Sequence, residues 1–132
     1  MKYLCSLLLL FVSACDMIVP PWQLYALYRT ARRPVVCAAG EDCKDKWARA
    51  TEWVKTNAKY PIVMYTDRLI KTADSVSASP DAAFTISLVP AEGNIYTVHF
   101  DADCSDIFGC SPPLLKLKAD FIHYVLDIQP RQ

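Results

Sequence analysis

The sequence has little glycine, no excess of charge of either sign and, beyond its first residues, no long hydrophobic run. Three of the 132 residues are glycine and nine are proline, so we expect stiff turns and no long flexible linker. The 14 basic residues equal the 14 acidic residues, which argues against a protein that binds nucleic acid through its phosphates. The chain is 53% hydrophobic, too apolar for disorder, and its length suits one domain.

The sequence also lacks the short motifs that mark common active sites. It contains no Gly-x-Ser-x-Gly, no phosphate-binding glycine loop, no His-Glu-x-x-His and no Cys-x-x-Cys. His99 precedes Asp101 and Asp103 on an expected strand, so an envelope hydrolase that uses His99 is one alternative. A histidine on a solvated strand face is the simpler interpretation, and His123 fits a structural role on the last helix. We therefore predict no enzyme activity and no cofactor.

A metal site is also not expected. Asp101, Asp103 and Asp106 begin like a calcium loop, but the sixth and twelfth positions are Asp106 and Pro112 instead of glycine and glutamate. Weak cation binding at these three aspartates remains an alternative. A zinc site of four cysteines would usually have two to four residues between the paired cysteines, whereas here the gaps are five.

Residues 1–14 have the pattern of an export signal. Lys2 gives a positive start, and residues 3–12 form a hydrophobic run of about ten residues, where a bilayer span needs about 20. We therefore expect export without a transmembrane helix. The following stretch Val12-Ser13-Ala14-Cys15 resembles the lipobox of bacterial lipoproteins, with an aliphatic residue and two small residues before a cysteine.

This resemblance implies a lipid anchor. Residues 1–14 would be removed, and Cys15 would carry a diacylglycerol thioether and an amide-linked acyl chain such as palmitate, which anchor stably when two or three chains are present. The protein would then sit on a membrane of the bacterial cell envelope and face the periplasm. Asp16 resembles the inner-membrane retention signal of enteric bacteria. The resemblance covers residues 1–16 and identifies no domain family, and an ordinary signal peptide before a soluble domain is the alternative.

We expect residues 15–34 to form the lipid anchor and tether, and residues 35–132 a single α+β domain. The tether carries aromatic side chains followed by three arginines: Trp22, Tyr25, Tyr28, Arg29, Arg32 and Arg33. These residues suit a segment that lies on the membrane surface, with aromatics at the interface and arginines on phosphates. The interpretation we favour is a strand or arm, residues 23–29, that packs on the domain.

The domain is expected to have two helices. Trp47, Ala50 and Val54 recur at helical spacing in a helix that Asp42 would cap and that ends before Pro61, and Trp53 falls at the edge of the apolar face. We therefore expect Trp53 to be less buried than Trp47. The last helix would begin at residues 111–113, with Ser111 as its cap and an apolar stripe made of Leu114, Leu117, Phe121, Val125 and Ile128.

Three segments have strand patterns: residues 61–73, with a possible bulge near Thr66 and Asp67, residues 82–89 and residues 94–100. A short strand at residues 34–38 would be a fourth. The expected fold is an α+β domain, a three- to four-stranded antiparallel sheet with two helices packed on one face.

Four further cysteines form two pairs with equal gaps of five residues. Cys37 and Cys43, like Cys104 and Cys110, follow a strand-like segment and precede a helix. A local disulfide of this size stabilises by about 2.4 kcal/mol and a bridge between the two loops by about 4 kcal/mol, but proximity favours local pairing. We favour Cys37–Cys43 and Cys104–Cys110, and the cross-loop pairings stay open.

These observations favour a membrane-anchored binding module over an enzyme. Its partners would be the lipid bilayer, through Cys15, and an envelope protein, without nucleic acid. A periplasmic inhibitor or immunity protein is an alternative, for which a protruding acidic or aromatic loop such as residues 105–109 would be typical.

Overall fold

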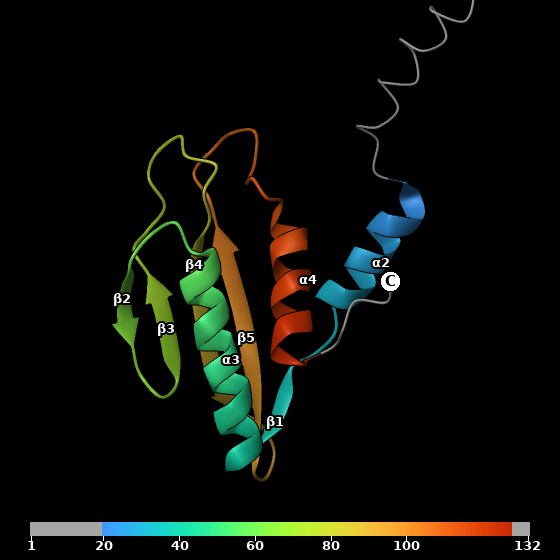
Figure 1. Ribbon diagram of the computed structural model, residues 1–132, viewed down its shortest axis with the longest axis vertical. Helices are drawn as coiled ribbons and strands as arrows, with labels where there is room; N and C mark the ends of the chain where they lie inside the picture. The colour runs from blue at the N-terminus through green and yellow to red at the C-terminus, as the bar shows by residue number, and fades with distance from the viewer. Residues whose placement is uncertain (1–19, 128–132) are drawn as a thin grey trace, which may run out of the picture.

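The computed structural model describes residues 20–127, which form one antiparallel sheet and three helices (Figure 1). Cys15, the expected export signal and Ile128 lie outside the described residues. The elements along the chain are α2 (Pro21–Ala31), β1 (Val36–Ala38), α3 (Glu41–Asn57), β2 (Ile62–Tyr65), β3 (Leu69–Thr72), β4 (Ala83–Pro90), β5 (Ile95–Asp103) and α4 (Leu114–Val125). The strand order is β1-β5-β4-β3-β2, with all neighbours antiparallel.

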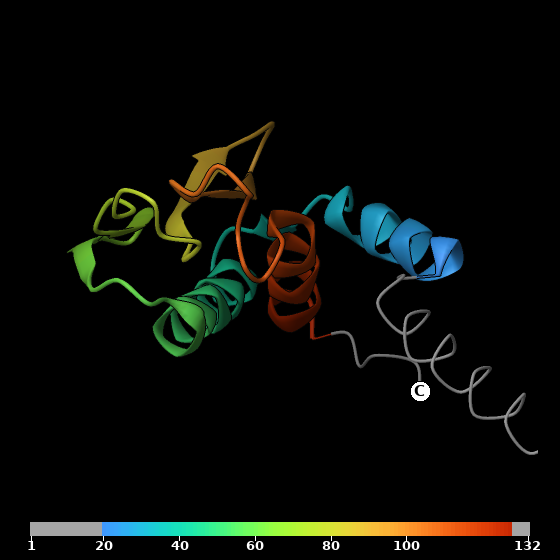
Figure 2. The ribbon, with the colours of Figure 1, turned by 90° about the horizontal axis from the view of Figure 1, so that it is seen from above.

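The α+β class and the antiparallel sheet are confirmed, whereas the expected numbers of elements are too low. The described part of the chain has five strands and a third helix, α2. Helices α3 and α4 lie on the same face of the sheet, and α2 packs against α4 on the side away from α3 (Figure 2). Residues 23–29 therefore pack on the domain as expected, but they do so as a helix and not as a strand.

Strands β4 and β5 follow the predicted alternation. Phe84 and Ile86 on β4 and Val98 on β5 are buried under the helices, whereas His99 is exposed on the other face. Side chains alternate between the faces of a strand, so one covered face produces this two-residue period. Strand β1 pairs with β5 at the position expected for the short fourth strand.

Residues 61–73 form a hairpin instead of one bulged strand. Strands β2 and β3 pair with each other, and the expected bulge near Thr66 is the turn between them. The Thr66 hydroxyl oxygen accepts hydrogen bonds from the backbone N–H groups of Arg68 and Leu69 at 3.1 and 2.9 Å. A threonine side chain thus closes a tight turn that contains neither glycine nor proline.

Both helix starts differ from the sequence-based expectation. Helix α3 begins at Glu41 after Gly40, whose φ of +103° suits glycine, so Asp42 lies inside the helix and is not its cap. Helix α4 begins at Leu114, after Pro113, and the Ser111 side chain makes no cap. Leu114 is 38% exposed, and the buried side of α4 consists of Leu117, Ala119, Phe121, Ile122 and Val125.

The centre of the core is an aromatic cluster around Trp53, so the expectation for this residue is wrong. Trp53 is 4% exposed, against 8% for Trp47. Its ring meets the rings of Phe84, Phe100 and Phe121 edge-on at centroid distances of 5.2, 5.7 and 5.3 Å. Trp53 is buried because α4 packs beside α3 and covers the edge of its apolar face.

We predict that Trp53→Ala lowers the free energy of unfolding by about 3–5 kcal/mol, because the substitution leaves a cavity shared by two helices and the sheet. Denaturant unfolding followed by circular dichroism measures the loss. The control Trp22→Ala removes an exposed ring and should change stability by no more than about 0.5 kcal/mol. Equal losses for the two variants would contradict the described packing.

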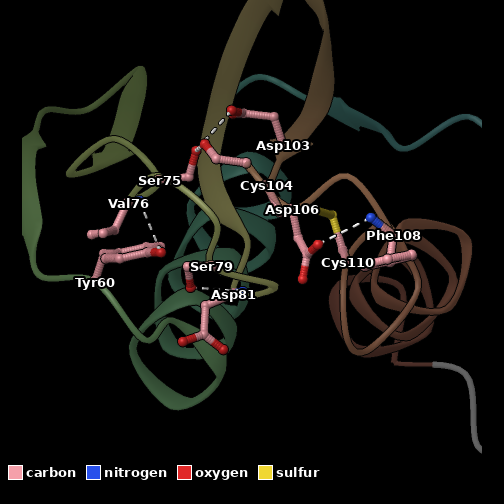
Figure 3. The surroundings of a disulfide bond; sticks show 11 residues. Tyr60, Ser75, Val76, Ser79, Asp81, Asp103, Cys104, Asp106, Phe108 and Cys110 are labelled. Atoms are coloured by element: carbon pink, nitrogen blue, oxygen red, sulfur yellow. Dashed lines mark hydrogen bonds between the residues drawn. A yellow bond between two sulfur atoms is a disulfide. The ribbon is translucent and has the colours of Figure 1, made fainter.

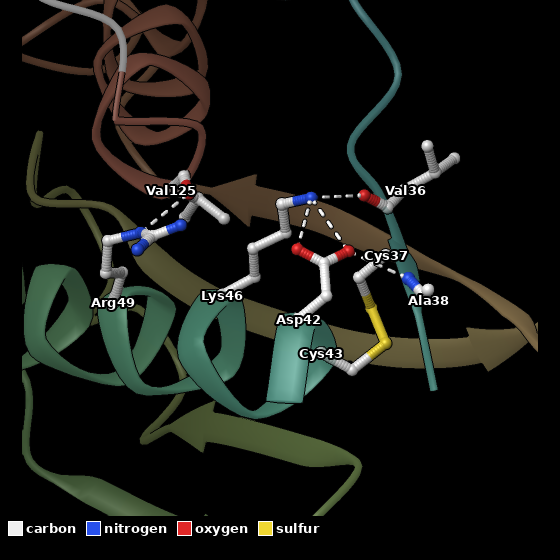
Figure 4. Close-up of polar contacts among 8 residues, drawn as sticks. All are labelled: Val36, Cys37, Ala38, Asp42, Cys43, Lys46, Arg49 and Val125. Atoms are coloured by element: carbon white, nitrogen blue, oxygen red, sulfur yellow. Dashed lines mark hydrogen bonds and ion pairs between the residues drawn. A yellow bond between two sulfur atoms is a disulfide. The ribbon is translucent and has the colours of Figure 1, made fainter. Parts of the chain in front are cut away.

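The outer edge of β1 is closed by two side chains of α3 (Figure 4). The Val36 carbonyl accepts a hydrogen bond from Lys46 Nζ at 3.0 Å, and the Ala38 N–H donates to Asp42 Oδ2 at 2.8 Å. Asp42 and Lys46 also form an ion pair at 3.1 Å. The hydrogen bond from Ala38, together with Lys46, lowers the pKa of Asp42 below its ordinary value of 3.8. This edge strand therefore offers few free backbone groups to another chain.

We predict a stability difference between wild type and Asp42→Asn that depends on pH. A carboxyl whose pKa is lowered by folding stabilises the fold above its unfolded pKa and loses this effect as the pH falls through the folded value. The variant should therefore be less stable near neutral pH, and the difference should shrink as the pH falls below the ordinary value of 3.8. Urea unfolding over a series of pH values tests this, with Asp45→Asn as an exposed control on the same helix. A difference that stays constant as the pH falls would exclude the charge of Asp42 as its cause.

Candidate functional site

The most exposed apolar side chains of the described residues lie on the loop between β5 and α4. Ile107 and Phe108, which we call the loop tip, are each 91% exposed. The disulfide Cys104–Cys110 closes the loop at its base, with Cα atoms 5.6 Å apart. Both local disulfides favoured by the sequence are present, the other being Cys37–Cys43.

Hydrogen bonds within the loop stabilise its turn. Asp106 Oδ1 accepts a hydrogen bond from the Phe108 N–H at 3.0 Å, and the Asp106 carbonyl accepts one from the Gly109 N–H at 3.1 Å. Gly109 has a φ of +94°, which residues with a Cβ rarely adopt. The aspartate and the glycine thus turn the chain so that the loop tip projects away from the domain.

A second loop, residues 73–82 between β3 and β4, supports the first (Figure 3). The Ser111 N–H donates to the Pro80 carbonyl at 2.9 Å, and the hydroxyl groups of Ser75 and Ser105 share a hydrogen bond of 2.6 Å. The Ser75 hydroxyl also lies 3.4 Å from Asp103 Oδ2. These contacts join residues about 30 positions apart. The order of residues in the sequence therefore could not predict that the two loops meet.

The loop tip borders a shallow hollow of about 550 Å³. Its lining combines acidic side chains with apolar ones: Asp103, Cys104, Asp106, Phe108, Gly109, Cys110, Pro113 and Leu114. This end of the molecule therefore has a projecting apolar dipeptide and a concave surface next to it. Such a surface can place two hydrophobic side chains in a pocket of another molecule.

The chain segment that contains the loop tip is acidic. Residues 72–115 contain six aspartates and glutamates and no lysine or arginine, although Glu92 lies in the turn at the other end of β5 and Lys116 follows the loop on α4. Asp103 ends β5 directly before the loop, Asp106 lies on the loop, and Asp81 lies on the supporting loop. The balanced charge of the whole chain thus conceals a strongly one-sided segment. A sliding-window count of charged residues along the sequence would have revealed this segment.

The other candidate residues from the sequence analysis do not come together as an active site in the described part of the chain. His99 is exposed on β5 opposite Ser87, and Asp101 and Asp103 follow on the same exposed face. The Cα atoms of residues two apart on a strand are separated by about 6.6 Å. The side chains of His99 and Asp101 would have to bend toward each other to come within hydrogen-bond distance. No hydrogen bond of the His99 side chain occurs among the described residues, and the hollow beside Asp103 does not include His99. His123 is half-buried on α4.

Within residues 20–127, no three histidine, cysteine, aspartate or glutamate residues are grouped so as to hold a metal ion. This includes Asp101, Asp103 and Asp106. In the same range no helix combines the length and the hydropathy that crossing a membrane requires. Comparisons of the chain with protein-family models, curated proteins and solved structures find no match.

We predict that replacing both Cys104 and Cys110 with alanine lowers stability by about 2 kcal/mol and frees the loop tip. Amide hydrogen exchange at Phe108 should become faster, because the disulfide no longer holds the turn that protects its N–H. The matched control replaces Cys37 and Cys43, which enclose a loop of the same size. Equal exchange rates at Phe108 in the two variants would show that the Cys104–Cys110 bond does not order the loop tip.

Proposed function

We propose that the protein is a lipid-anchored lipoprotein of the bacterial cell envelope that binds another protein through the loop tip. The observation that carries the binding role is the 91% exposure of both Ile107 and Phe108 on a loop closed by a disulfide. Apolar side chains exposed in this way are favourable to bury, by about 1.5–3 kcal/mol for each large residue.

The disulfide and the supporting loop increase what this burial contributes to affinity. A flexible loop loses conformational freedom when it binds, whereas a loop ordered beforehand loses less. The turn at Asp106, the bond Cys104–Cys110 and the contact of Ser111 with Pro80 all order the loop in the free protein. Aromatic residues, phenylalanine among them, are enriched in the core of protein interfaces, whose rim is polar.

The charges define the partner's chemistry. Because Asp103 and Asp106 flank the loop tip, the partner surface should be an apolar pocket with basic side chains at its rim. The same charges disfavour an anionic lipid surface as the ligand of the loop tip. The partner proposed here is therefore a protein, and an acylated Cys15 would keep the domain close to it in the periplasm.

A periplasmic inhibitor is the more specific version of this proposal. A projecting, disulfide-closed loop with an aromatic residue suits insertion into an enzyme's active-site entrance, and the loop tip has this form. The discriminating observation is the activity of the partner: an inhibitor abolishes it, whereas an accessory subunit leaves it intact. The hydrolase alternative has less support, since His99 is exposed on β5 and makes no hydrogen bond to an aspartate within residues 20–127.

We predict that Ile107→Ser together with Phe108→Ser weakens partner binding at least about 30-fold and leaves the unfolding free energy unchanged. A photo-crosslinking amino acid at position 108, introduced in cells that make the protein, identifies the partner. The affinity of the purified pair is then measured by titration calorimetry with wild type and variant.

The matched control is Val63→Ser together with Tyr65→Ser, which removes two exposed apolar side chains from β2. This control should retain wild-type affinity. Equal affinities of the loop-tip variant and the wild type would contradict the proposed binding site, as would crosslinks from position 108 to lipid alone.

A further inference from the structure

Helix α2 has two different faces, and the outward one is basic and aromatic. Trp22, Tyr25, Arg29 and Arg32 are spaced by three, four and three residues, so they share one side of the helix. On the other side, Leu27 is half-buried and Ala31 is buried, where α2 meets α4. Figure 2 shows α2 as the outermost of the described helices, with α4 between it and α3.

The aromatic rings of α2 are not part of the core. Trp22 is 68% exposed and Tyr25 63%, although tryptophan and tyrosine are usually among the more buried residues. Arg29 lies over the ring of Tyr25 at 6.0 Å, and Arg32 over that of Tyr28 at 5.3 Å. These contacts place two guanidinium groups beside two exposed rings. Arg29, Arg32 and Arg33 also line one shallow hollow on α2.

The outward face has no negative charge. Residues 20–33 contain three arginines and no aspartate or glutamate. Arginines among exposed tryptophan and tyrosine rings match the boundary of an anionic bilayer, where the rings lie at the headgroup level and the arginines meet phosphates. The acidic end around the loop tip has the opposite charge and would be repelled by the same surface.

The position of the expected anchor places α2 near such a boundary. Cys15 precedes Pro21 by six residues, and six residues span at most about 20 Å when fully extended. An acylated Cys15 therefore holds the first turn of α2 within that distance of the lipid headgroups. A helix tethered so closely has a high effective concentration at the surface, so weak contacts suffice to dock it.

We propose that α2 is a second membrane contact, which lies on anionic phospholipid through Trp22, Tyr25, Arg29, Arg32 and Arg33. The inference rests on the proposed lipid anchor and adds an orientation to it. With α2 docked on the headgroups, the domain has a fixed side toward the membrane instead of rotating freely about its tether. The ligand is the phosphate and glycerol region of an anionic lipid, not a particular lipid species.

The natural probe is Trp22, because it is exposed whereas Trp47 and Trp53 are buried. The full protein, purified from its native membrane, is added to vesicles of phosphatidylcholine alone or mixed with phosphatidylglycerol. Tryptophan emission and quenching by acrylamide, which is uncharged, are measured after subtraction of the signal of Trp22→Phe. On the anionic vesicles we expect a shift of Trp22 emission to shorter wavelength and weaker quenching, both reversed by salt.

The variant Arg29→Gln with Arg32→Gln and Arg33→Gln should lose this protection. Each arginine near an anionic surface contributes about fivefold to the docking equilibrium, so the three together contribute on the order of 100-fold. The matched control replaces three exposed lysines of the α3 region by glutamine, Lys44, Lys55 and Lys59, and makes the same change of net charge. This control should retain the wild-type protection of Trp22.

Flotation of the vesicles separates this inference from the anchor. Protein that floats with phosphatidylcholine vesicles carries a functional anchor, and if its Trp22 stays fully quenchable on anionic vesicles, the role of α2 is overturned. Protein that floats only with anionic vesicles, with Trp22 protected, supports the role of α2 without the anchor. Protein that floats with neither overturns both. Protection of Trp22 that requires an added protein also overturns the lipid contact.

Discussion

The packing of Trp53 is the constraint on which the rest of the structure depends. Its ring contacts Phe84 and Phe100 of the sheet and Phe121 of α4, so one side chain of α3 joins all three parts of the core. The position of α4 follows from this contact, and the two surfaces of interest are attached to α4. The β5–α4 loop leads into its first turn, and α2 packs along its side.

The distribution of charge separates these two surfaces. The chain has no net charge, yet its residues 72–115 hold acids without lysine or arginine, and residues 20–33 hold arginines without acids. Apolar side chains are exposed in both places, on the loop tip and on α2. An acidic surface and a basic surface select different ligands. We interpret the acidic end as the side that meets a protein and the basic helix as the side that meets lipid.

The sequence predicted the features that depend on local pattern. The alternation along β4 and β5 sufficed because one face of these strands is covered. Proximity along the chain favoured the two disulfides that are present, although the sequence left the cross-loop pairings open. Features that depend on distant neighbours were missed. Trp53 is buried by a helix some 60 residues later, and Ser75 supports a loop 30 residues away. The turn at Thr66 lacks glycine and proline, and the sequence marks it only through Thr66 and Asp67, which suit a bulge as well as a turn.

The account combines a lipid anchor with two closed disulfides, and the intact mass of the native protein tests both at once. The protein is extracted from its membrane and alkylated without prior reduction. The account predicts a mass that lacks residues 1–14, includes acyl chains on Cys15 and shows no alkylated thiol. A mass without acyl chains and with Cys15 alkylated would contradict the anchor. Four further alkylated thiols would contradict the closed loop on which the proposed binding site depends.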